Sequence, residues 1–114
     1  MQDPPNSSLQ LVEQKIYLMS HFSFDQRVEN LFKSYFSTYS NINIELNEKK
    51  ISIHIVDDNN HDSASIDLIK LEDFHQITFW DGYSQSEIIE AFNEKDSAKT
   101  LKRFMKKLIK ILDR

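Results

Sequence analysis

Apolar side chains recur three and four positions apart over residues 9–39, the spacing that predicts helical structure. Residues 1–8 lack this spacing and are expected to form a frayed lead-in. Ser23, three residues before Gln26, resembles a capping box, which would start a second helix or restart the first. The pattern therefore predicts that the N-terminal third of the chain is helical.

The period changes to two over residues 42–92, where apolar and polar residues alternate in several short runs. Ile69 and Leu71 leave the phase of the preceding run, which predicts a bulge or the end of a strand. Residues 86–92 fit either a strand or a helix, and the strand is the favoured interpretation. The region is expected to form an antiparallel meander of four or five strands.

The chain ends with a second helical pattern over residues 96–113, for which Asp96 or Ser97 is the expected N-cap. Before it, Asp81 and the single glycine, Gly82, form a dipeptide that favours a type I′ hairpin turn. Helices, then a meander, then an amphipathic helix predict an α+β fold, with residues 1–114 forming one domain.

The strand phase assigns residues to two faces of the predicted sheet. If the isoleucines of residues 51–55 and the apolar residues Ile77 and Phe79 face the helices, the opposite face is mostly polar. Its expected members are Ser52, His54, Ser65, Asp67, Gln76, Thr78 and Trp80. A tryptophan on such a face could anchor a partner, although folding over the sheet edge to complete the core is the favoured interpretation.

Composition narrows the class of protein. The chain has 114 residues and no cysteine, which excludes disulfides, thiol catalysis and thiolate zinc sites. No apolar run approaches the roughly eighteen residues of a membrane span, and residues 1–5 do not resemble the start of a signal peptide. A cytoplasmic protein without membrane contact is expected.

Charge is divided unevenly along the chain. Residues 99–114 contain seven basic residues and one acidic residue, a net of +6, whereas residues 1–98 have a net of −10. The basic residues of the last helix could bind nucleic acid, or they could form its solvated face, which is the favoured interpretation. Residues 57–96 hold eleven carboxylates against two lysines, a net of −9, and this acidic stretch favours a basic partner.

No combination of residues predicts a catalytic site. Residues 57–62 are rich in oxygen ligands but lack the glycine and glutamate of a calcium loop, so a solvated turn is expected rather than a metal site. His54 and His75 could form a two-histidine acid/base pair if their strands were neighbours, although scattered structural histidines are the favoured interpretation. We expect no enzyme activity, no catalytic residue, no metal and no cofactor.

Three segments suggest a family: residues 65–68 (SIDL), 76–82 (QITFWDG) and 87–91 (EIIEA). Together they resemble small bacterial immunity proteins, which neutralise polymorphic toxins, including those of contact-dependent inhibition. The TriTu-type immunity family is the nearest pattern, although residues 83–85 lengthen the turn relative to it. The resemblance implies a cytosolic antitoxin bound to a cognate toxin domain and transfers no catalytic residue.

The sequence therefore predicts an immunity protein, a monomer or weak dimer, that neutralises a basic toxin such as a nuclease domain. The expected partner-binding residues are Asp57, Asp58, Asp62, Asp67, Glu72, Asp73, Trp80, Asp81 and Tyr83. An acidic secretion-system chaperone that binds an effector is the alternative. A small nuclease or nucleic-acid-binding protein is a further alternative of lower rank.

Overall fold

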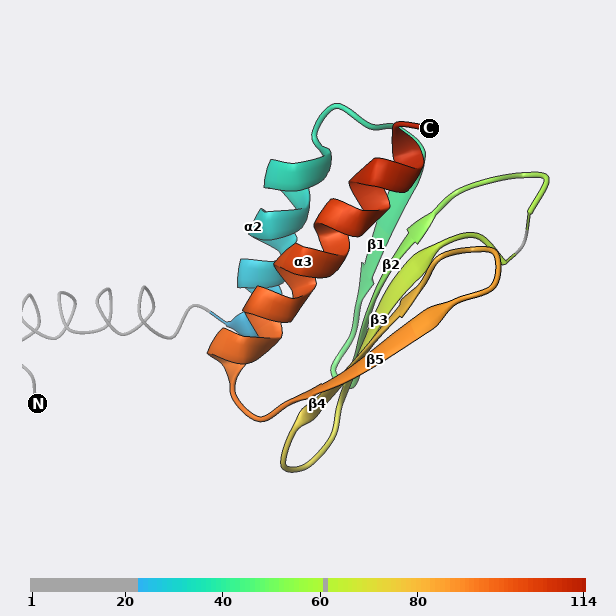
Figure 1. Ribbon diagram of the computed structural model, residues 1–114. Coiled ribbons are helices and arrows are strands. Elements are labelled where there is room, and N and C mark those ends of the chain that lie inside the picture. Colours follow the sequence, from blue (N-terminus) through green and yellow to red (C-terminus); the bar gives the residue numbers. More distant parts are fainter. Residues whose placement is uncertain (1–22, 61) are drawn as a thin grey trace, which may run out of the picture.

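The computed structural model describes residues 23–60 and 62–114. In this part of the chain a helix precedes a five-stranded sheet and a longer helix follows it, which is the predicted α+β fold (Figure 1). The elements are α2 (Phe24–Phe36), β1 (Ile42–Leu46), β2 (Lys50–Ile55), β3 (Ser65–Lys70), β4 (His75–Trp80), β5 (Ser86–Ala91) and α3 (Glu94–Leu112). The predictions for residues 1–22 lie outside the described residues.

The strands form an antiparallel meander in the order β1-β2-β3-β4-β5. The fifth segment is a strand, as favoured, because β5 pairs along its length with β4 and places Ile88 opposite Thr78. Of the two outcomes predicted for Ile69 and Leu71, the end of the strand is confirmed: β3 continues in regular register to Lys70 and ends there without a bulge. Ile69 therefore simply points to the other face of the sheet.

Both helices cover the same face of the sheet, and the core lies between the two layers (Figure 1). As predicted, Ile77 and Phe79 and the isoleucines of β2 face the helices and are buried. The helices meet them with Phe24, Val28, Phe36, Leu101, Phe104, Met105 and Leu108. Burying each such side chain contributes about 1.5 to 3 kcal/mol, so this interface is the main source of stability.

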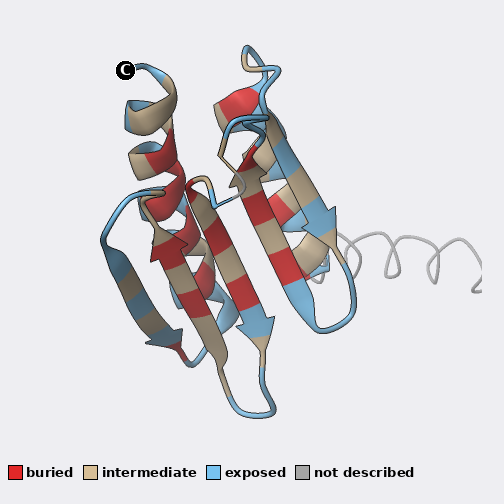
Figure 2. Cartoon of the chain, turned by 90° about the vertical axis from the view of Figure 1, so that its right-hand side faces the viewer, coloured by how far each residue is buried: buried red, intermediate tan, exposed pale blue. Residues whose placement is uncertain are grey.

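The alternation of buried and less buried residues is visible along the three central strands in Figure 2, with the helices behind the sheet. The face toward the viewer carries the polar set that the strand phase predicts, including Ser52, Asp67 and Thr78, which pair across β2, β3 and β4. No described helix covers this face (Figure 2).

The two helix starts test the capping predictions. The Ser23 hydroxyl accepts a hydrogen bond from the Gln26 amide at 3.1 Å, which confirms Ser23 as the N-cap of α2. The prediction for the last helix was wrong. Asn93, rather than Asp96 or Ser97, is the N-cap of α3, and its side-chain oxygen accepts from the Asp96 amide at 2.8 Å.

The predicted two-residue turn at Asp81-Gly82 is also wrong in type. Gly82 has the expected positive φ, 83°, but the connection is longer, because the Asp81 amide donates to the Gln85 carbonyl. A Cβ atom on Gly82 would lie 2.7 Å from the Ala64 amide nitrogen. Glycine is therefore required both by the backbone conformation and by the close approach of the neighbouring loop.

Candidate functional site

The nine predicted partner-binding residues do not form one surface. Because strands alternate in direction, the loops after β2 and β4 lie at one end of the sheet and the loop after β3 lies at the other. We call residues 56–60, 62–63 and 81–85 the Trp80 end, and residues 71–74 and 92–94 the Phe92 end. The strands between them have six residues, so about 20 Å separates the two ends.

The Trp80 end holds most of the acidic residues that the sequence predicts to bind a partner. One of them, Asp81, instead accepts hydrogen bonds from its own loop. One oxygen of Asp81 accepts hydrogen bonds from the amides of Tyr83, Ser84 and Gln85 at 2.8 to 3.0 Å. These amide hydrogen bonds, Gln85 and Tyr83 contributing most, hold the pKa of Asp81 below its ordinary value. Asp81 therefore orders its own loop.

The loop after β2 uses its side chains in the same way. Asp57 accepts from the Asn59 amide at 2.9 Å, and Asn60 accepts from the Asp62 amide at 3.0 Å. These are the local turns that the sequence favoured over a metal loop. Asp58 and Asp62 are exposed at this end.

Trp80 lies on the sheet face away from the helices, opposite Ser65 and Ser86, so the interpretation that it completes the core is wrong. Its indole N–H donates to the Asp62 carbonyl at 2.9 Å. The indole is half-buried and supports the loop after β2. Tyr83, with 87% of its surface exposed, is the most exposed aromatic residue of the described chain.

Asp67 is the one predicted site residue in the middle of the uncovered face. It lies 3.6 Å from the Lys50 ammonium group on the neighbouring strand. Both side chains are partly exposed, so this pair contributes little stability.

The Phe92 end combines carboxylates with an exposed apolar group. Phe92 is 66% exposed, and its ring stacks on Phe74 with centroids 5.3 Å apart. Leu71, 43% exposed, lines the same hollow of about 180 Å³. The carboxyl-bearing residues that line it are Glu72, Asp73 and Glu94.

This arrangement is typical of a protein-binding surface. Large apolar side chains exposed together and bordered by polar groups are found where a partner removes them from water. Aromatic anchors supply most of the binding energy at such a surface, and the charged border selects the partner. Sequence reasoning identified Glu72 and Asp73 but missed Leu71, Phe74 and Phe92. The sequence did contain a signal for this surface: Phe74 comes just before β4 and Phe92 just after β5, outside the apolar faces of these strands.

The two histidines proposed as an acid/base pair lie on opposite faces of the sheet, so that arrangement is wrong. His54 pairs with Asn43 and Ser65 on the uncovered face. His75 lies on the helix side, where its Nδ1 is 2.8 Å from the hydroxyl of the buried Ser97. Burial lowers the pKa of His75 from its ordinary value.

Part of the basic face of α3 is engaged with the sheet. Arg103 donates to both oxygens of Glu87 on β5, at 3.2 and 2.7 Å, and the Lys107 ammonium lies 2.7 Å from the same carboxylate. These two cations lower the pKa of Glu87 to about 2. Lys107 also lies over the Phe79 ring. The remaining exposed lysines of α3 include Lys99, Lys102, Lys106 and Lys110.

The chain matches no known family model, curated protein or solved structure. In the described residues, no helix is both long enough and apolar enough to pass through a bilayer.

Proposed function

We propose that this protein is an immunity-type inhibitor that binds and neutralises a cognate bacterial toxin in the cytoplasm, and that the Phe92 end makes the contact. The observation that carries the proposal is the exposed Phe92 ring stacked on the half-buried Phe74 and bordered by carboxylates. The absence of cysteine fits a reducing compartment. The resemblance of residues 76–82 and 87–91 to immunity proteins supports the same class of function.

The chemistry of the Phe92 end describes the partner. Glu72, Asp73 and Glu94 favour a partner that presents lysine or arginine around an apolar side chain or cleft. A toxin domain that acts on nucleic acid has such a basic surface, because it must bind phosphate. Complementary charge also accelerates the encounter, which suits an inhibitor that must bind the toxin before it acts.

The test is a binding measurement with the protein encoded immediately upstream of this gene, where the proposal predicts a toxin domain. Phe92→Ser should weaken the complex by about 2 kcal/mol, or about thirtyfold in Kd, because it removes an apolar anchor. Tyr83→Ser is the matched control: it removes an even more exposed aromatic ring from the Trp80 end. Calorimetry gives Kd, and rescue of bacterial growth on co-expression reports neutralisation.

A second pair of variants separates charge from packing. Reversing Glu72 and Asp73 to lysine should slow association and reduce its dependence on salt, whereas reversing Asp57 and Asp58 should change the association rate less. The opposite ranking, or equal losses for Tyr83→Ser and Phe92→Ser, would contradict the assignment to the Phe92 end. A dimer that Phe92→Ser converts to a monomer would instead favour the acidic-chaperone alternative.

A further inference from the structure

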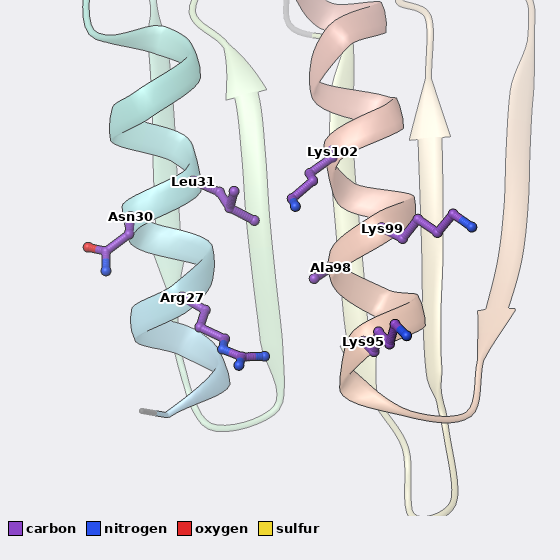
Figure 3. Close-up of a pocket in the computed structure, with 7 residues that line it drawn as sticks. All are labelled: Arg27, Asn30, Leu31, Lys95, Ala98, Lys99 and Lys102. Carbon is purple, nitrogen blue, oxygen red and sulfur yellow. The ribbon is translucent and has the colours of Figure 1, made fainter. Parts of the chain in front are cut away.

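The helix layer carries a groove that the proposed function does not use. It lies between the first halves of α2 and α3 and has a volume of about 810 Å³ (Figure 3). Leu31 of α2 and Ala98 of α3, both half-buried, provide its apolar part. The volume falls within the range of about 300 to 1,000 Å³ that is usual for binding sites.

The groove is strongly basic. Four cations line it: Arg27 from α2 and Lys95, Lys99 and Lys102 from α3. Figure 3 shows Arg27 and Lys102 extending toward the space between the helices, whereas Lys95 and Lys99 extend toward the other side of α3. No carboxylate from the described part of the chain lines the groove.

The described residues do not neutralise these four cations. The ion pairs of this part of the chain involve Lys50, Lys70, Arg103 and Lys107 instead. Three carboxylates on the same two helices have other partners. Asp25 pairs with Lys70, Glu29 accepts from the Gln26 amide group, and Asp96 accepts from Asn93.

We propose that this interhelical groove binds an acidic, amphipathic peptide segment of a partner protein. Such a segment would place apolar side chains against Leu31 and Ala98 and carboxylates toward Arg27 and Lys102. A nucleic-acid strand fits less well. A phosphate group makes no favourable contact with the apolar part of the groove. Residues 1–98 also carry a net charge of −10, which repels a polyanion. The inference does not depend on the Phe92 end, which favours a basic partner.

The experiment uses the full chain and a labelled synthetic peptide of about 16 residues, long enough for about four helical turns. The peptide carries leucine at positions i, i+3, i+4 and i+7 and glutamate elsewhere. Two control peptides replace either every glutamate with lysine or every leucine with serine. Fluorescence anisotropy should show binding of the acidic leucine peptide alone, weakening between about 50 and 300 mM salt as charges are screened.

The variants locate the binding site. Arg27→Glu with Lys102→Glu should weaken binding at least tenfold, which corresponds to about 1.4 kcal/mol. Lys33→Glu with Lys110→Glu is the matched control: it makes the same change in net charge on the same two helices, at exposed positions that do not line the groove. This control should leave the Kd within about twofold, since the two changed charges are remote and screened. Circular dichroism shows that each variant is folded.

Three results would overturn the inference. The first is equal losses in the two double variants, because the effect would then be one of net charge alone. The second is binding of a single-stranded oligonucleotide, with the same dependence on Arg27 and Lys102, in place of the peptide. The third is peptide binding that arises only after Val12→Asp with Ile16→Asp, because the chain's own N-terminal segment would then be the occupant.

Discussion

The two ends of the sheet have similar acidic compositions, but only the Trp80 end uses carboxylates to bind amides of its own loops. At the Trp80 end, Asp81 and Asp57 accept hydrogen bonds from backbone amides of their own loops. At the Phe92 end, Glu72 and Asp73 are exposed around an apolar hollow and accept no hydrogen bond from the described residues. A carboxylate that already accepts several amides stabilises the fold, whereas an exposed one beside an aromatic ring is available to a partner. Net charge along the chain does not distinguish the two cases.

The largest expected effect tests the rigidity of the Trp80 end. Gly82→Ala should destabilise the protein by about 2 to 4 kcal/mol, because the new Cβ strains a positive φ and meets a backbone atom of Ala64. Urea unfolding followed by circular dichroism measures the loss. Ser84→Ala, in the same exposed loop, is the control and should leave the midpoint unchanged. A loss in Gly82→Ala no greater than in Ser84→Ala would show that the close approach to Ala64 is dispensable.

The next effect compares the carboxylates themselves. Asp81→Ala should lower the melting temperature, because three loop amides lose their acceptor, while Glu72→Ala at the Phe92 end should not. Asp81→Asn should recover part of the loss, since an amide oxygen can still accept. Differential scanning calorimetry ranks the three variants. Equal melting temperatures for Asp81→Ala and Glu72→Ala would remove the distinction between the two ends.

A smaller effect concerns Glu87, which attaches the edge strand β5 to α3. The pKa of Glu87 is lowered from 4.5 to about 2 by Arg103 and Lys107. Its contribution to the free energy of unfolding is therefore complete above pH 4.5 and is lost as the pH falls toward 2. The groups are about a third or more exposed and screened by solvent, so the contribution is about 1 kcal/mol or less. Glu87→Gln should reduce the fall in stability over that pH range, measured by urea unfolding at several pH values. An unchanged pH profile would contradict the ion-pair assignment.

The smallest effect lies at the Phe92 end. Burial, opposed by Glu94 and Asp25 and aided by Lys70, lowers the pKa of His75 below its ordinary value of 6.5. As the pH falls, the unfolded chain therefore binds a proton at a higher pH than the folded protein does. The free energy of unfolding is thus greatest above pH 6.5 and falls as the pH drops below this value. His75→Gln should flatten the stability profile in this range, measured by urea unfolding at several pH values, and an unchanged profile would contradict the assignment to His75. NMR titration of the His75 imidazole measures its pKa directly.

Several features could be predicted because they depend on short-range patterns. The alternation over residues 42–92 assigned the isoleucines of β2, and Ile77 and Phe79 of β4, to the buried face, since successive side chains in a strand point in opposite directions. The same rule separates His54 from His75, because His54 is in phase with Ser52 and His75 with Ile77. The N-cap of α3 was also readable: Asn93 stands three residues before Asp96, the spacing of a side-chain cap.

The sequence by itself determined the elements, the two sheet faces and the Ser23 cap, because each depends on residues within a few positions of one another. Only the tertiary structure decided which charged groups are engaged and which are free for a partner. It brought Phe92 onto Phe74, Glu87 onto Arg103, and Arg27 beside the lysines of α3. The reason is physical, because hydrogen bonds and ion pairs require atoms within about 3 to 4 Å of each other. Residues that are far apart in the sequence reach such distances only in the folded chain. Acidity along the sequence predicted a binding protein, and the structure shows that the exposed Phe92 lies at one end of the sheet.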